Sequence, residues 1–253
     1  GADFLPIVGN DGAAGHDMTG LLDPLGERAA GLVVGQHARV GHRQDRQHDA
    51  FTVAQRHLGA CRESGGELFR VKKAGADTSK VVFAGVGKTD DEIRFALECN
   101  ILKFDVESEA ELDVLSEVAV GLGLKAPVSL RVNPNVDPKT HPYISTGLKG
   151  NKFGVAFDEV LPTYRAAAAM PNLRVVGIDC HIGSQITEVS PYLDALDKVL
   201  DVVSKLDAEG IRLSHIDVGG GLGITYTDET PPDITAFART LLDRVEQRGF
   251  GDR

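Results

Sequence analysis

The chain has 253 residues, of which 42% are hydrophobic and 25% are charged, a globular composition that excludes wholesale disorder. Lys and Arg number 27 against 37 Asp and Glu, and the resulting net charge of −10 disfavours nucleic acids and anionic membranes as partners. No apolar run approaches the ~20 residues of a membrane span, and the N-terminal sequence lacks the order of a signal peptide. Three widely spaced cysteines (Cys61, Cys99 and Cys180) fit reduced thiols. We therefore expect a cytoplasmic α/β protein.

Residues 1–63 differ in composition from the rest of the chain. They contain no lysine, six arginines, ten glycines and five of the eight histidines, and they show little periodicity. No histidine pair there has the spacing of metal ligands on a helix, so we expect no metal site. We divide the chain into an atypical segment of uncertain fold at 1–63 and a domain at 64–253.

From residue 79 onward, strands and helices alternate. This rhythm predicts a parallel sheet with helical crossovers. The strands read as nearly continuously apolar, which is typical of strands covered on both faces. An open doubly wound sheet and an eight-stranded barrel both satisfy the pattern. The predicted strands are 81–86, 103–108, 127–134, 175–183 and 215–223. One predicted helix begins at Thr89, and the others span 108–123, 158–170, 190–210 (with Ser190 as N-cap) and 234–249.

In either architecture the active site lies at the carboxyl ends of the strands. Polar or glycine-rich residues cluster at those ends. They are Glu107–Ser108, Asn133–Pro134, His181–Ser184 and Gly219–Gly221.

Two glycine motifs follow strands. AGVGKT (84–89) has the context of a phosphate-binding P-loop, but Val82 occupies the position of its first glycine, so Thr89 is interpreted as a helix cap. DVGGGLG (217–223) is either a nest of backbone amides that holds a phosphate or a tight loop at a barrel rim. Ile224 stands where a dinucleotide fingerprint needs its third glycine, which disfavours a dinucleotide site.

CHIGSQ (180–185) places His181 at a strand end with Ser184 three residues later. A lone histidine is usually structural. The neighbouring glycines nevertheless indicate a phosphate-bearing cofactor with the imidazole near its reactive part. The long loop at 140–154 is either a functional rim loop or a surface insertion.

Seven ordered motifs together resemble those of the diaminopimelate decarboxylases, a branch of the fold-type III pyridoxal-phosphate enzymes. The resemblance covers residues 64–250. The HPYISTG loop and the Gln of HIGSQ favour this branch over ornithine or arginine decarboxylases and amino-acid racemases. The motifs are SGGELFR (64–70), FAGVGKT (83–89), FDVESEAEL (104–112), SLRVNP (129–134), HPYISTGLKGNKFGV (141–155), GIDCHIGSQI (177–186) and DVGGGLGI (217–224).

The resemblance implies an α/β fold of the alanine racemase-like type, a TIM-like (β/α)8 barrel, and pyridoxal 5'-phosphate as cofactor. It implies that His181 is the catalytic residue that stacks on the pyridine ring. Ser184 and the backbone of Gly219, Gly220 and Gly221 would bind the phosphate, and Arg131 would lie in the pocket floor. The implied reaction converts meso-diaminopimelate to L-lysine and CO₂ in lysine biosynthesis, in a homodimer.

The sequence also departs from the family. The Schiff-base lysine of the first barrel strand is expected near His42, yet no lysine precedes Lys72. The motif of the eighth strand and the C-terminal β-domain, with its proton-donor cysteine, have no counterpart before Arg253. We therefore expect an incomplete barrel and a truncated, inactive copy, in which a shifted reading frame upstream of about residue 63 would explain the abrupt change in composition. The alternative is a non-catalytic paralogue that kept a binding or regulatory surface.

Overall fold

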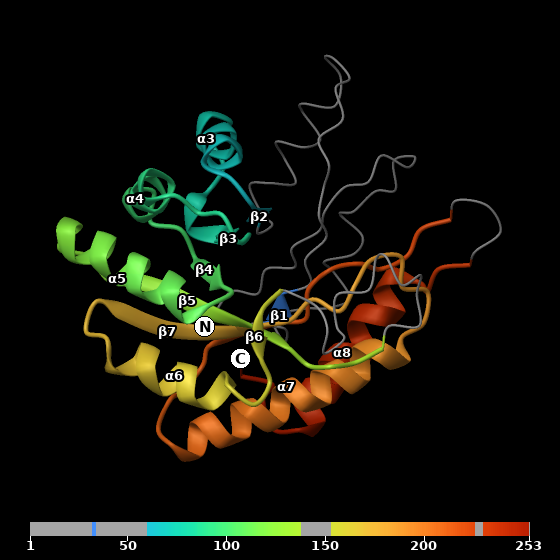
Figure 1. Cartoon of the computed structure of the whole chain (residues 1–253). Coiled ribbons are helices and arrows are strands. Elements are labelled where there is room, and N and C mark those ends of the chain that lie inside the picture. The colour runs from blue at the N-terminus through green and yellow to red at the C-terminus, as the bar shows by residue number, and fades with distance from the viewer. Residues whose placement is uncertain (1–31, 34–59, 138–152, 226–229, 253) are drawn as a thin grey trace.

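The computed structural model describes residues 32–33, 60–137, 153–225 and 230–252. Alternating strands and helices make up this part of the chain (Figure 1). The strands are β1 (Leu32–Val33), β2 (Ala60–Arg62), β3 (Val81–Phe83), β4 (Lys103–Val106), β5 (Ala126–Asn133), β6 (Val155–Ala156), β7 (Leu173–Asp179) and β8 (His215–Asp217). The helices are α3 (Gly65–Lys73), the short 3-10 helix η2 (Thr78–Lys80), α4 (Asp90–Glu98), α5 (Glu109–Leu122), α6 (Val160–Ala169), α7 (Ser190–Ala208) and α8 (Ile234–Gln247).

The strand order decides between the two architectures that the sequence allows. The sheet runs β1-β8-β7-β5-β4-β3-β2, with every pair parallel and β6 added beside the end of β5. From β2 to β8 the strands follow one another in chain order, without the reversal that defines a doubly wound sheet. The fold is therefore a partial barrel, with β1 and β2 at the two edges of the described sheet, as the resemblance implies.

The helix predicted to begin at Thr89 and the helix predicted at 108–123 are confirmed as α4 and α5, and their caps explain where they begin and end. Ser108 precedes α5 and its hydroxyl accepts a hydrogen bond from the Glu111 N–H, while Gly123 ends the helix with φ of 64°. Thr89 is the N-cap of α4 and forms a reciprocal capping box with Glu92, which confirms its interpretation as a cap. The same Glu92 carboxylate also accepts the N–H of Gly65 at 2.8 Å and so fastens α3 to α4.

Other predicted boundaries were wrong in detail. The strands expected at 175–183 and 215–223 end earlier, at Asp179 and Asp217, and Gly219, two residues after Asp217, turns the backbone with a φ of 71°. Ser190 is not the N-cap of α7. Val189 takes that position, and the Ser190 hydroxyl donates to the Glu188 carboxylate instead of accepting a backbone N–H.

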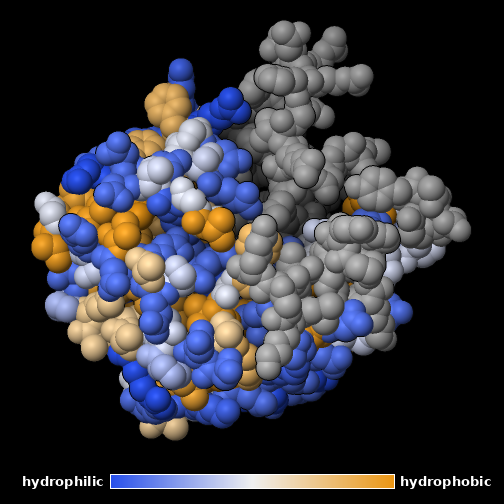
Figure 2. Space-filling view, viewed as in Figure 1, coloured by the Kyte–Doolittle hydropathy of each residue, from blue (hydrophilic) through white to orange (hydrophobic). Residues whose placement is uncertain are grey.

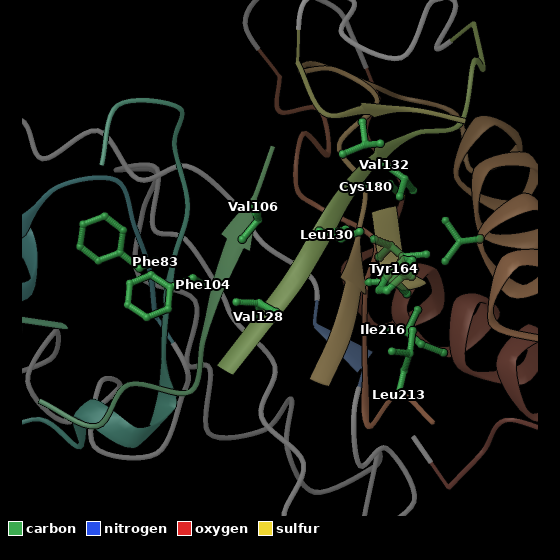
Figure 3. Close-up of a cluster of buried hydrophobic side chains, with 14 of the residues drawn as sticks. Phe83, Phe104, Val106, Val128, Leu130, Val132, Tyr164, Cys180, Leu213 and Ile216 are labelled. Carbon is green, nitrogen blue, oxygen red and sulfur yellow. The ribbon is translucent and has the colours of Figure 1, made fainter. Parts of the chain in front are cut away.

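The hydrophobic core lies between the sheet and its helices. Figure 3 shows the side chains of Val128, Leu130 and Val132 projecting from β5, with Tyr164 of α6 beside them. Each of these residues is at most 1% exposed. The Tyr164 hydroxyl donates to the carbonyl of Gly177 at 2.7 Å, which ties α6 to β7.

The opposite face of the sheet is charged, which contradicts the expectation of continuously apolar strands. Side chains alternate along a strand, so residues two apart share a face. Lys103 and Asp105 on β4, Asp179 on β7 and Asp217 on β8 all lie on this inner face and are at most 6% exposed. The sheet therefore carries an apolar outer face under the helices and a buried charged inner face.

The face of the molecule seen in Figure 2 is largely hydrophilic. Figure 2 shows hydrophilic residues over much of the coloured part of the molecule, with hydrophobic residues gathered in smaller areas between them. No helix in the described ranges has the length and hydrophobicity needed to cross a bilayer. The loop at 140–152 and the segment 1–63, apart from β1, β2 and Glu63, lie outside the described residues.

Candidate cofactor site

The loops after β7 and β8 lie side by side at the carboxyl ends of these strands. Ile186 and Leu222 form an isolated parallel bridge. The N–H of Ile186 donates to the carbonyl of Gly221 at 2.9 Å, and the N–H of Gly223 donates to the carbonyl of Ile186 at 2.8 Å. The two motifs CHIGSQ and DVGGGLG, separated by about 35 residues in the sequence, are thus joined into one structural unit.

Glycine is required at two positions where these loops meet. At Gly219, with φ of 71°, a Cβ would lie 2.3 Å from the carbonyl oxygen of Cys180 and 3.0 Å from the Cα of His181. At Gly221, with φ of 93°, it would lie 1.8 Å from the carbonyl oxygen of Gly183 and 3.2 Å from the Cα of Ser184. These approaches place the predicted residues of the two motifs in direct proximity.

The N–H groups of the glycine turn have distinct partners. Gly219 donates to Asp217 Oδ1 at 2.9 Å, and Gly220 donates to His181 Nδ1 at 3.4 Å. Because His181 Nδ1 accepts this bond, its proton lies on Nε2. Within the described residues, the N–H groups of Gly221 and Ser184 donate to no protein acceptor, and Ser184 is exposed. This pair of N–H groups and the Ser184 hydroxyl form a small cluster of donors that can hold an anion.

Helix α7 supports the turn from behind. The buried Tyr192 hydroxyl donates to the carbonyl of Gly220 at 3.1 Å, and its ring packs edge to face on Phe237 of α8 with centroids 4.8 Å apart. Burial raises the pKa of Tyr192, so the hydroxyl keeps the proton that it donates. The turn is therefore fixed on its outer side by two packed helices.

Below the turn, the inner face of the barrel holds a cluster of buried charges. One carboxylate oxygen from each of Asp105, Asp179 and Asp217 lies within 4.8 Å of the others. Lys103 Nζ donates to Asp105 Oδ1 and lies 3.3 Å from Asp217 Oδ2. Burial opposes the charge on Lys103, but Asp105, Asp217 and Asp179 together raise the pKa of its ammonium group. Lys103 is therefore a cation held among carboxylates.

Two of these carboxylates have raised pKa values. Burial, followed by repulsion from Asp105 and Asp217, raises the pKa of Asp179 well above its ordinary range. Burial raises the pKa of Asp217 to about 6, although the Lys103 ammonium acts in the opposite direction. Asp179 and Asp217 at the base of the candidate site therefore bind a proton more readily than exposed carboxylates do.

Arg131, which was predicted to lie in the pocket floor, is on β5 and lies among acidic side chains from neighbouring parts of the barrel. Its guanidinium donates to Glu107 Oε1 at 2.9 Å and has Asp179 Oδ2 at 3.9 Å, and it lies over the ring of Phe153. The second Glu107 oxygen accepts the N–H of Gly154 at 3.2 Å. Arg131 and Glu107 thereby hold the start of β6 against the barrel, and Asp179 connects Arg131 to the charged inner face.

The structure therefore brings together His181, Ser184 and the glycine turn, and it places Arg131 in an adjoining ion-pair cluster. Sequence reasoning missed Lys103, Asp105, Asp179 and Asp217. Their signal was present as charged residues two apart in KFD, and as an Asp at the end of both VVGID and HID. Ser108, at a predicted active-site end, proves to be a helix cap.

A family model described as "Pyridoxal-dependent decarboxylase, pyridoxal binding domain" matches residues 53–252. The chain belongs to this family. The cofactor of this family is pyridoxal phosphate, as the resemblance implies.

Relatives within the pyridoxal-dependent decarboxylases agree with this assignment. Diaminopimelate decarboxylase of Vibrio cholerae is 58% identical over 182 residues, which cover 72% of this chain and 44% of that protein. The enzyme of Pseudomonas aeruginosa is 55% identical over 185 residues, which cover 73% and 45%. The chain thus spans less than half the length of these curated relatives.

Solved structures confirm the barrel fold. Diaminopimelate decarboxylase from Helicobacter pylori, complexed with L-lysine, superposes with a TM-score of 0.75 at 42% identity and covers 79% of this chain and 51% of that chain. The enzyme from M. jannaschii, also with L-lysine, gives a TM-score of 0.76 at 38% identity, with 87% and 51% covered. The described half of the fold is therefore a partial barrel of the diaminopimelate decarboxylase type.

Proposed function

We propose that this chain supplies the pyridoxal-phosphate-binding barrel of a diaminopimelate decarboxylase, the enzyme that converts meso-diaminopimelate to L-lysine and CO₂. The observation that carries the proposal is the junction of the loops after β7 and β8, where His181, Ser184 and the glycine turn meet. We propose that residues 64–253 form the body of this partial barrel domain and that residues 1–63, an atypical segment of uncertain fold, add the edge strands β1 and β2 to it.

The donors at this junction fit a phosphate group. A phosphate accepts hydrogen bonds from backbone N–H groups in a glycine-rich turn without a charged side chain. The N–H groups of Gly221 and Ser184 and the Ser184 hydroxyl are available within the described residues, whereas the N–H groups of Gly219 and Gly220 fix the turn itself. The proposal therefore assigns the direct phosphate contacts to Gly221 and Ser184.

His181 is proposed to present its ring to the cofactor. Its Nδ1 is held by the Gly220 N–H at 3.4 Å, so the orientation of the imidazole follows that of the glycine turn. When bound, pyridoxal phosphate supplies an electron sink for the bond that loses CO₂. His181, Ser184 and Gly221 would bind and orient the group. Arg131 would stabilise the adjoining part of the barrel through its hydrogen bond to Glu107.

The test is a fluorescence titration of the purified chain with pyridoxal phosphate and, separately, with pyridoxal, which lacks the phosphate. We expect tighter binding of the phosphorylated form and a loss of about tenfold in Ser184→Ala, the size of one hydrogen bond to a charged group. His181→Ala should weaken both ligands together, because both lose the stacked ring. Equal affinity for the two ligands in the wild-type chain would contradict the proposal.

For the protein as a whole, we propose a homodimer located in the cytoplasm with meso-diaminopimelate as substrate. Sedimentation velocity tests the assembly, and a purely monomeric species at micromolar concentration would contradict it.

A further inference from the structure

We infer that Lys103 is a positioning residue of the phosphate-binding turn and acts on it through Asp217. The inference rests on the proposed function of the turn. It assigns a role to a buried lysine that lies on the opposite side of the sheet from the helices and whose hydrogen bonds go to Asp105 and Asp217, not to His181 or the glycines.

The first step of this connection is an ion pair. Lys103 is fully buried on β4, and its Nζ contacts two strands, since Asp105 lies on the same strand and Asp217 lies on β8. Both carboxylates are also buried. A buried ammonium of this kind is retained only when its charge is paired, so removing it leaves the carboxylates uncompensated.

The second step uses the two oxygens of one carboxylate. Asp217 Oδ2 faces Lys103 at 3.3 Å, while Asp217 Oδ1 accepts the N–H of Gly219 at 2.9 Å. Lys103 therefore fixes the rotation of the Asp217 side chain about its own axis. Without it, repulsion from Asp105 acts on an Asp217 whose remaining hydrogen bond among the described residues comes from the Gly219 N–H.

The third step passes from the turn to the ring. Gly219 adopts a φ of 71°, and the N–H of the next residue, Gly220, donates to His181 Nδ1. A change in the Gly219 peptide therefore alters the direction of the Gly220 N–H and the orientation of His181. Lys103 thus reaches both parts of the candidate site, the phosphate-binding turn and the imidazole.

Lys88 offers a matched control. Its side chain is also fully buried and also pairs with a carboxylate, Glu111. Its other acceptors are the carbonyl oxygens of Gly85 at 2.7 Å and Asp105 at 2.6 Å, and it has no bond to Asp217. Lys88→Met should therefore reduce stability without a selective effect on the glycine turn.

The test measures amide hydrogen exchange by NMR in the ligand-free chain, for Lys103→Met and Lys88→Met. Each rate is compared with the slowest core amides of the same variant, which report global unfolding. In Lys103→Met we expect the Gly219 and Gly220 amides to exchange about tenfold faster than the global change explains, as for the loss of a hydrogen bond to a charged group. In Lys88→Met these amides should follow the global change. Proportional exchange in both variants would overturn the inference.

Two additions keep the result decisive. If Lys103→Met does not fold, Lys103→Met/Asp105→Asn removes one carboxylate together with the ammonium and leaves Asp217 in place for the same measurement. The ratio of the affinities for pyridoxal phosphate and pyridoxal should fall about tenfold in the Lys103 variant and stay unchanged in Lys88→Met. A wild-type chain without preference for the phosphorylated ligand contradicts the proposed function, whereas the exchange data decide the role of Lys103 separately.

Discussion

Gln185 and Ile224 are joined by a pair of hydrogen bonds: the Gln185 side-chain amide donates to the Ile224 carbonyl and accepts the Ile224 N–H at 3.1 Å. The side chain thus continues the ladder between the loops after β7 and β8 beyond the Ile186–Leu222 bridge. Gln185 holds a φ of 57°, an unusual backbone conformation for a residue other than glycine. The contact therefore fixes the distance between the two halves of the candidate site.

Gln185→Glu should separate these halves. The variant keeps the shape of the side chain but replaces the amide donor by a carboxylate that faces the Ile224 carbonyl. We expect a loss of about 1–3 kcal/mol in the free energy of unfolding and weaker binding of pyridoxal phosphate. Urea unfolding and the fluorescence titration measure the two effects. Wild-type values for both would show that the contact does not hold the loops.

Gly221→Ala should be strongly destabilising. The added Cβ would lie 1.8 Å from the Gly183 carbonyl oxygen, and φ at this position is 93°. Strain and displacement together should cost about 3 kcal/mol or more. Gly87→Ala is the control, because a Cβ there meets no atom within 4 Å and its φ is not in the left-handed region. Thermal unfolding of both variants tests the comparison, and equal midpoints would contradict it.

Asp217→Asn should change how stability depends on pH. The folded pKa of Asp217 is about 6, against an ordinary value of 3.8, so the folded chain binds this proton more tightly than the unfolded chain. Its contribution to stability is present below about pH 4 and is lost as pH rises through about 6. Among the described residues, the groups that face it are Lys103, Asp105, Asp179 and the Gly219 N–H.

Relative to wild type, Asp217→Asn should therefore gain up to about 3 kcal/mol in unfolding free energy between pH 4 and pH 7. Chemical denaturation at intervals across this range measures the difference between the two proteins, which removes the titration of the groups that do not interact with Asp217. A difference that stays constant with pH would contradict the raised pKa.

The 253-residue polypeptide by itself should not attach pyridoxal phosphate covalently at a single lysine or decarboxylate meso-diaminopimelate above the rate of the free cofactor. Attachment needs a neutral amine, but Lys103 has a raised pKa and Lys88 is bonded to three oxygens. No lysine precedes Lys72 in the sequence. Borohydride reduction followed by peptide mass spectrometry tests attachment. Reduced cofactor found at a single lysine residue in all molecules would refute this prediction. So would release of free L-lysine above the rate of the free cofactor.

The sequence was most informative where local chemistry determines structure. Thr89, interpreted as a helix cap, is the N-cap of α4, and the helix expected at 108–123 is α5, which Ser108 and Gly123 cap. The barrel itself could not be separated from a doubly wound sheet by pattern, because strand order depends on pairing between distant segments. The resemblance to a family supplied that information.

The charged inner face was missed for a related reason. Lys103 and Asp217 are 114 residues apart, and each alone looks like an isolated charge in an apolar strand. Their burial becomes favourable only when β4 and β8 face each other across the inside of the barrel. The assignment of Gly219 and Gly220 to internal hydrogen bonds was equally unavailable, since the sequence does not reveal which N–H groups already have partners.

The central claim is that the junction of the β7 and β8 loops holds the phosphate of the cofactor. A ¹⁵N NMR titration of the chain with pyridoxal phosphate tests it most directly, since it observes each backbone N–H. The account predicts saturable shifts that are largest at Gly221 and Ser184, with smaller shifts at Gly219 and Gly220, and much weaker changes with pyridoxal. Shifts confined to other parts of the chain, with Gly221 and Ser184 unmoved at saturation, would contradict it.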